Sequence, residues 1–318
     1  FFYFVWFILL LFNILTVDNR LSRGMSNNGI EAKVKRILSI AVISGFFVSI
    51  YGILQIIGVD FLHWPEEPSA TGRALSTFGQ PNFLASCLVM VILFIAYLIY
   101  DSRQSLVKFF YILALMGQLL CLFFTGSRGG LIAFVLSIFL LLFYFFFSAK
   151  IRNTHKAFIT VGLLALIAAG LFGLNNFLPG RISGITNLKE GSMAARVNFY
   201  QAAADAISKK PIFGYGLENA GQEFIKYYTP EWGIYGDVGA TTDRAHNLVL
   251  DILMNVGFFG LALFSILFFY FFQLAQENIK RRGASFLPLA LLGGAFAYLA
   301  SLLFSFTIVA AEVYFWLF

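Results

Sequence analysis

The sequence predicts an all-α integral membrane protein, a polytopic bundle of about eight to nine transmembrane helices. Hydrophobic residues make up 59% of the 318-residue chain and charged residues only 12%, well below the roughly 25% that is typical of soluble domains. The apolar residues form long runs, most of which approach the roughly 20 residues that a helix needs to cross a bilayer. Alternation of period two, which would mark membrane-spanning strands, is absent, so helices are expected throughout.

The expected helices follow the apolar runs, and together they form a single membrane domain over 1–318. The runs are 1–16, 37–57, 83–100, 109–125, 130–147, 157–175, 248–273 and 286–308, with a further one from near Val313. Both ends of the chain, Phe1 and Phe318, lie inside apolar runs. We therefore expect a piece of a longer membrane protein that lacks helices at both ends.

Basic residues in the short loops predict the orientation. They occur after the first run, at Arg20, Arg23, Lys33, Lys35 and Arg36, and in the loops 101–108, 148–156 and 274–285. These loops come at every second crossing, so one topology places all of them in the cytoplasm. The net charge of +6 then reflects the positive-inside rule, and no nucleic-acid partner is expected. The long segment 176–247 becomes a large extracytoplasmic loop.

Part of this large loop is expected to be helical. Ser192 can cap a helix that Pro211 ends. The aromatic and glycine content of 227–240 suggests a loop on the membrane interface.

Polar clusters capable of chemistry all fall on the outer side in this topology. The candidate residues are Arg73, Ser127, Arg128, Arg196, Tyr200, Arg244, His246 and Asn247. Arg128 lies in a Gly/Ser turn that opens a helix, where backbone N–H groups and the helix dipole favour a phosphate. The guanidinium can bind phosphate oxygens with two hydrogen bonds. The alternative is an arginine that reaches the lipid headgroups as an interfacial anchor.

His246 is the candidate base. Thr242 or Asp243 is expected to cap the next helix, which puts His246 in its first turn, where the helix dipole favours neutral imidazole. A neutral histidine can accept a proton, and Asp251, further along the same helix, is the candidate to orient the ring. The alternatives are a histidine that bonds its own helix start, or a Ser127–His246 dyad of an intramembrane protease.

Metal and nucleotide chemistry are not indicated. The sequence has no Asp-x-Asp, no His-x-x-x-His and no cysteine cluster, and Cys87 and Cys121 both lie inside apolar runs. A Walker-type loop is absent as well.

An ordered set of motifs over about residues 70–265 resembles the O-antigen ligase/O-antigen polymerase superfamily. The motifs are Phe78-Gly-Gln-Pro-Asn-Phe-Leu-Ala85, Thr125-Gly-Ser-Arg-Gly-Gly130, Arg196-Val-Asn-Phe-Tyr200, Pro211-Ile-Phe-Gly-Tyr-Gly216, Ala245-His-Asn-Leu-Val-Leu-Asp251 and Gly257-Phe-Phe-Gly260. The large outer loop is also typical of this superfamily.

The resemblance implies a GT-C-like, metal-independent, inverting glycosyltransferase of the bacterial inner membrane, without a cofactor. It would move a glycan from a polyprenyl diphosphate carrier to lipid A–core, a growing glycan or a protein on the periplasmic face. Arg128 and Arg196 would bind the diphosphate, and His246 would assist the acceptor hydroxyl. Arg73, Ser127, Tyr200, Arg244 and Asn247 are the expected substrate-binding residues.

The alternative from another class is a small-anion transporter or channel. It would need charged residues at mid-membrane, whereas the apolar runs are nearly free of charge.

Overall fold

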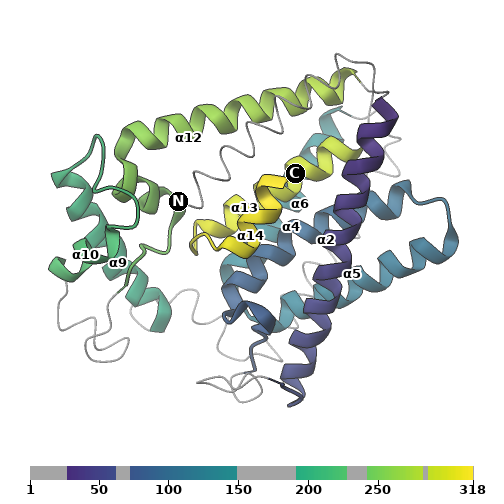
Figure 1. Cartoon of the computed structure of the whole chain (residues 1–318), viewed down its shortest axis with the longest axis horizontal. Helices are drawn as coiled ribbons and strands as arrows, with labels where there is room; N and C mark the ends of the chain where they lie inside the picture. Colours follow the sequence, from purple (N-terminus) through teal and green to yellow (C-terminus); the bar gives the residue numbers. More distant parts are fainter. Residues whose placement is uncertain (1–26, 62–71, 149–190, 228–241, 282–285, 318) are drawn as a thin grey trace.

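The described part of this computed structural model comprises residues 27–61, 72–148, 191–227, 242–281 and 286–317, and it contains helices and no strand (Figure 1). The helices are α2 (Asn27–Ile56), α4 (Pro81–Asp101), α5 (Ser105–Thr125), α6 (Arg128–Ser148), α9 (Gly191–Lys209), α10 (Ala220–Phe224), α12 (Leu248–Arg281), α13 (Phe286–Leu302) and α14 (Val309–Leu317), with 3₁₀ turns at Ser76–Phe78 and Ile225–Tyr227. The predicted all-α class is confirmed for these residues.

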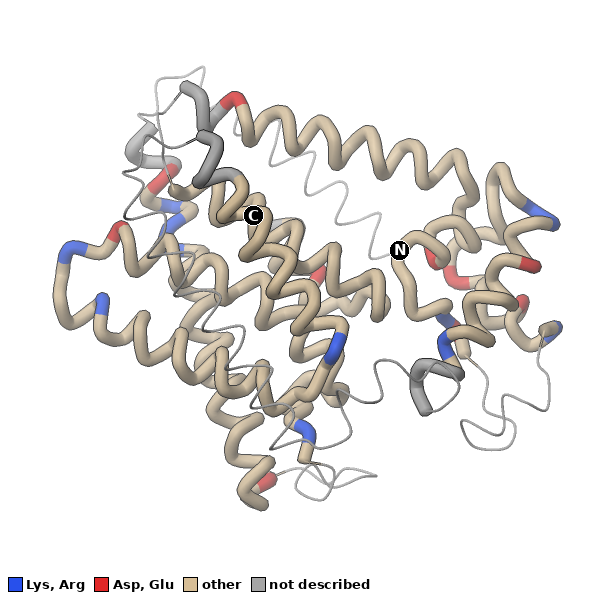
Figure 2. Tube along the Cα trace, turned by 180° about the vertical axis from the view of Figure 1, so that it is seen from behind, with Lys and Arg blue, Asp and Glu red and all other residues tan. Residues whose placement is uncertain are grey.

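Among the described residues, 4 helices are long and apolar enough to cross a membrane. They cover Glu31–Ile56, Pro81–Asp101, Ser105–Thr125 and Leu248–Glu277, while α6 and α13 are apolar but shorter. Figure 2 shows lysine and arginine mainly near helix ends and turns, with long uncharged stretches between them. The predicted runs 1–16 and 157–175 lie outside the described residues, and the loop 176–247 is described only in part.

Helix α4 is the centre of the bundle and packs against α2, α5, α6 and α13. Its Phe94 and Leu98 are buried with Tyr298 of α13 in one core cluster. A Cβ at Gly294 would lie 2.5 Å from the Phe94 ring, so this glycine permits α13 to approach closely. The helix begins at Pro81, in the first helical position that suits proline, and the Gln80 side chain accepts the N–H of Asn82.

Two boundaries differ from the prediction. Helix α2 begins at Asn27, so Lys33, Lys35 and Arg36 lie in the helix and not in a loop, and Lys35 pairs with Asp101 at the end of α4. The run 286–308 was expected to be one helix, but α13 ends at Leu302.

Residues 303–308 form a turn, because the chain tightens at the end of α13. The N–H groups of Leu303, Phe304 and Ser305 donate to carbonyls three residues back, at 3.3, 3.1 and 3.4 Å. This short-range bonding ends an α-helix.

Helix α12 is broken at Gly257, whose φ of 65° and ψ of −167° are not helical. The loop Pro211–Gly216 fills the break. Tyr215 and Gly216 donate their N–H groups to the carbonyls of Met254 and Asn255, at 2.8 and 2.9 Å. Phe258 and Phe259 donate to the carbonyls of Pro211 and Ile212, at 2.8 and 3.1 Å. The loop thus satisfies backbone groups that the break would leave without partners.

Gly257→Ala is expected to destabilise the protein strongly. A Cβ at this position would lie 2.2 Å from the carbonyl oxygen of Ile212, and the backbone conformation, one that is essentially limited to glycine, adds about 1–3 kcal/mol of strain. Gly58→Ala is the matched control, since Gly58 has a φ of 84° and open space around it. Thermal denaturation in detergent should show a much larger fall in Tm for Gly257→Ala. Equal falls in Tm would mean that the close packing of the loop against Gly257 does not contribute to stability.

Candidate functional site

The starts of α4 and α6 are joined beside Arg128. Ser127 caps α6, because its Oγ accepts the N–H of Gly130 at 3.2 Å, and it donates to Oδ1 of Asn82 on α4 at 2.9 Å. Arg128 is the first residue of α6. The prediction that Arg128 lies in a turn opening a helix is therefore confirmed. Ser127 caps this helix and links it to α4.

Arg73 lies against the same turn. Its Nε donates to the carbonyl of Thr125 at 2.9 Å, and the N–H of Ala74 donates to the carbonyl of Phe124 at 2.9 Å. These bonds satisfy carbonyl groups at the end of α5. They also hold the Arg73 guanidinium at the carbonyl of Thr125, three residues before Arg128 in the chain.

His246 lies just before α12 and not in its first turn. The helix begins at Leu248, and Oδ1 of Asn247 accepts the N–H groups of Val249 and Leu250 at 3.0 and 3.2 Å. Asn247 is therefore the N-cap, and the predicted cap at Thr242 or Asp243 is wrong. Thr242 instead bonds within its own turn and donates to the carbonyl of Arg244 at 2.6 Å.

Two phenylalanines hold the imidazole ring. Phe199 of α9 stacks on it with ring centroids 5.7 Å apart, and Phe306 meets it edge-on at 4.9 Å. Phe306 also packs edge-on against Phe83 of α4 at 4.9 Å. Phe306 lies in the turn 303–308, so the sequence prediction of one helix over 286–308 missed this part of the site.

Asn247 fixes the same turn from the other side. Its Nδ2 donates to the carbonyl of Leu303 at 3.1 Å, which ties the start of α12 to the end of α13. The sequence does contain a sign that the helix ends before 308. Three polar residues, Ser301, Ser305 and Thr307, interrupt the apolar run there.

Burial and, to a smaller extent, the positive charge of Arg196 lower the pKa of His246 to about 4, while Asp243 acts in the opposite direction. The imidazole is therefore neutral at pH 7, as predicted. The predicted cause, the dipole at a helix start, is replaced by burial and a neighbouring arginine.

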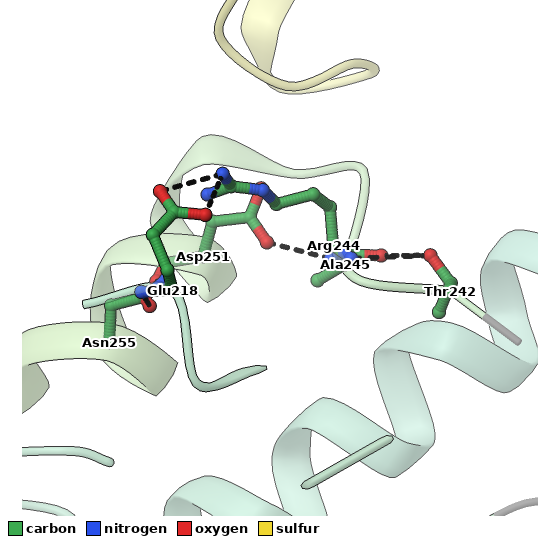
Figure 3. Close-up of polar contacts among 6 residues, drawn as sticks. All are labelled: Glu218, Thr242, Arg244, Ala245, Asp251 and Asn255. Atoms are coloured by element: carbon green, nitrogen blue, oxygen red, sulfur yellow. Dashed lines mark hydrogen bonds and ion pairs between the residues drawn. The ribbon is translucent and has the colours of Figure 1, made fainter. Parts of the chain in front are cut away.

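Asp251 supports the loop and not the ring. Its Oδ1 accepts the backbone N–H of Ala245 at 2.7 Å (Figure 3). This bond, one residue away from His246, helps to hold the histidine in a backbone conformation with a φ of 56°, which is uncommon outside glycine.

Arg196 and Tyr200 lie one turn apart on α9, which begins at Gly191, one residue before the predicted cap Ser192, and ends before Pro211 as predicted. Burial lowers the pKa of the Arg196 guanidinium, nearby Tyr200 raises it, and the charge of Arg128 lowers it. Arg196 is thus close enough to both Arg128 and His246 for their charges to interact. The Tyr200 hydroxyl reaches the carbonyl of His246 at 3.5 Å, a long contact.

Arg244 forms an ion pair with Glu218, at 2.9 and 2.7 Å from its two carboxylate oxygens (Figure 3). The backbone N–H of Glu218 donates to Oδ1 of Asn255 on α12 at 3.0 Å. The guanidinium that was predicted to bind substrate therefore also fastens the loop 242–247 to the segment after α9.

No cluster of three or more histidine, cysteine, aspartate or glutamate side chains suited to a metal occurs in the described ranges. The groups brought together at this site are guanidinium groups, an imidazole, and aromatic rings.

Comparison with known proteins finds the same superfamily that the sequence motifs resemble. Residues 111–265 match the family described as O-antigen ligase. A ComP-specific O-oligosaccharyltransferase of Acinetobacter baylyi is 26% identical over 294 residues, which are 90% of this chain and 50% of the relative. An uncharacterised protein of Haemophilus influenzae is 29% identical over 183 residues, 54% of this chain and 44% of the relative.

The chain thus spans about half the length of the curated relatives that it matches. The family match begins in α5 and ends in α12, so it covers Arg128, Arg196 and His246. The motif resemblance, the family match and the apolar helices agree, and together they support the O-antigen ligase superfamily for this chain.

Proposed function

We propose that this protein is a membrane glycosyltransferase that moves a glycan from a polyprenyl diphosphate carrier to an acceptor at the periplasmic face of the bacterial inner membrane. The observation that supports it best is that Arg196 lies close to both Arg128 and a neutral His246. One of the relatives is named as an O-oligosaccharyltransferase, which supports the same reaction class.

Arg128 and Arg196 would bind the diphosphate. Arg196 is partly buried, and the like charge of Arg128 repels it. Partial burial and like-charge repulsion both destabilise the charged guanidinium groups when no anion is bound. A diphosphate between them would offset both costs. In the reaction the bond from the anomeric carbon to the diphosphate oxygen breaks, and the arginines would stabilise the negative charge that develops on this leaving group without a metal.

His246 would act as the general base. The acceptor hydroxyl oxygen attacks the anomeric carbon from the face opposite the diphosphate, which inverts the configuration, and its proton passes to the neutral imidazole. The nearby Arg73, Ser127, Tyr200, Arg244 and Asn247 would position the donor and the acceptor. For Ser127, Asn247 and Arg244 this positioning is through the turns that they hold.

The test is transfer in a defined system. Purified protein in lipid nanodiscs, given a polyprenyl-diphosphate-linked glycan and candidate lipid, glycan or protein acceptors, is expected to form a glycosylated product. Transfer should persist in excess chelator, because the proposed leaving-group stabilisation uses arginines. A strict requirement for Mg²⁺ or Mn²⁺ would contradict this mechanism. Anion flux through proteoliposomes without any glycan transfer would favour the transporter alternative.

Phe306→Ala is expected to change the pH dependence of transfer. The base works only as neutral imidazole, so transfer falls as the pH drops through the pKa of His246, which is about 4 in the intact site. Removing the Phe306 ring admits water to the imidazole and raises this pKa toward the ordinary value of about 6.5. The acidic limb of the pH–rate profile should therefore move to higher pH.

Phe83→Ala is the matched control, since Phe83 contacts Phe306 and lies one ring further from the imidazole. Its acidic limb is expected to stay near that of the unmodified protein. The charged groups around the ring, Arg196 on α9 and Asp243 in its own loop, are unchanged in both variants. Identical profiles for the two variants would show that Phe306 does not control the charge of His246.

A further inference from the structure

The loop Pro211–Gly216 carries an exposed apolar surface. Ile212 is 61% exposed and Phe213 is 69% exposed. They adjoin Phe258 and Phe259 just after the break in α12, with the rings of Phe213 and Phe259 5.7 Å apart. We refer to these four large side chains as the loop–helix patch.

The loop–helix patch continues the outward side of α12. Large apolar side chains further along the helix are also exposed, among them Leu263, Ile266 and Phe269. Only 22% of the most apolar window of α12 is buried inside the protein, which is typical of a helix that faces lipid. The patch is therefore an extension of a lipid-facing surface beyond the helix itself.

The position of the helix break indicates where the bilayer begins. The candidate span Leu248–Glu277 has 30 residues, about 45 Å at 1.5 Å per residue, whereas the hydrocarbon core is about 30 Å thick. Before the break, Asp251 and Asn255 are buried and bind backbone N–H groups of loop residues. These polar groups belong outside the hydrocarbon core, so the crossing begins near Phe258.

Lysine and tyrosine side chains flank Ile212 and Phe213 in the chain. Lys209 lies over the ring of Tyr227 at 4.7 Å, and Lys210 lies over the ring of Tyr215 at 4.6 Å. Tyrosine and lysine favour the headgroup region, where the apolar part of the side chain contacts lipid and the polar end contacts water and phosphate.

We propose that the loop Pro211–Gly216 is a membrane anchor that inserts Ile212 and Phe213 into the leaflet nearest α9. The lipid surface is the partner, with apolar tips in the acyl region and Lys209 and Lys210 at the headgroups. The anchor holds the end of α9 at the membrane surface and so sets the height of Arg196 above the bilayer. This assignment rests on the loop and on α12, and it does not depend on the proposed transfer reaction.

The test measures depth with a spin label. Phe213→Cys is labelled in nanodiscs, with Ser208→Cys on α9 as the water-facing control and Leu263→Cys on α12 as the lipid-facing control. All three positions are exposed, and the native Cys87 and Cys121 are buried, so labelling is selective. Relaxation of each label by oxygen, which concentrates in lipid, is compared with relaxation by a water-soluble nickel complex.

The label at position 213 is expected to respond more to oxygen than to nickel, as the label at 263 does, and the label at 208 should show the reverse. A label at 213 that responds to nickel like the one at 208 would overturn the anchor. Protection from both reagents would overturn it as well, since the patch would then be covered by protein. Both readings are independent of whether the protein transfers glycans.

Discussion

His246→Ala is expected to reduce glycan transfer by about 10²–10⁴-fold, the usual contribution of general base catalysis. The acceptor hydroxyl is a weak nucleophile until its proton is taken, and His246 is a neutral imidazole near Arg196. The measurement is the initial rate of transfer in nanodiscs. Binding of the lipid-linked donor is measured in parallel and should remain largely intact, because the diphosphate would contact the arginines.

His63→Ala is the control for this prediction. It makes the same chemical change at a histidine outside the described residues, and its effect on transfer should be mild. If His246→Ala kept near-normal turnover, the base assignment would be wrong and stabilisation of the leaving group would have to account for the whole rate.

Arg196→Ala is expected to lower transfer by about 10²–10³-fold, similar to the loss of one preorganised donor to a developing negative charge. Arg128→Lys keeps the charge but loses the planar two-pronged geometry, so it should also lower transfer strongly. Steady-state rates and donor affinity are the measurements. Arg244→Lys, at the ion pair with Glu218, should have a smaller effect on both.

A second measurement separates this role from a structural one. Arg196 is partly withdrawn from water and is disfavoured by the charge of Arg128. Removing its charge should therefore leave Tm without donor unchanged or raised, while the gain in Tm on adding donor should shrink. A large fall in Tm without donor, or full activity of both Arg196→Ala and Arg128→Lys, would contradict the proposed diphosphate site.

The helices were predictable where local chemistry decides them. Pro81 begins α4 and a left-handed Gly126 ends α5, and both predicted runs end within a few residues of the observed helices. The start of α12 and the end of α13 were not predictable in this way. Asn247 caps α12 instead of Thr242 or Asp243, because its amide can also reach the carbonyl of Leu303, a contact between distant parts of the chain.

The candidate site was predictable by residue type but not by arrangement. Arg128, Arg196 and His246 could be named from motifs, because charged groups beside glycine-rich turns are rare in such an apolar chain. The rings around His246 could not, since Phe199 and Phe306 are two of 40 phenylalanines and only the folded chain distinguishes them. The motifs Pro211-Ile-Phe-Gly-Tyr-Gly216 and Gly257-Phe-Phe-Gly260 are far apart in the sequence. In the folded chain, backbone hydrogen bonds join them where the loop fills the break in α12.

This junction has a mechanical consequence. Because the loop after α9 is bonded into the break of α12, backbone hydrogen bonds couple the two helices, and with them Arg196 and the start of α12. Arg128 belongs to α6, in the bundle around α4. A diphosphate held between Arg128 and Arg196 would therefore cross-link this junction to the bundle, beside the hydrogen bond that Asn247 already makes to Leu303.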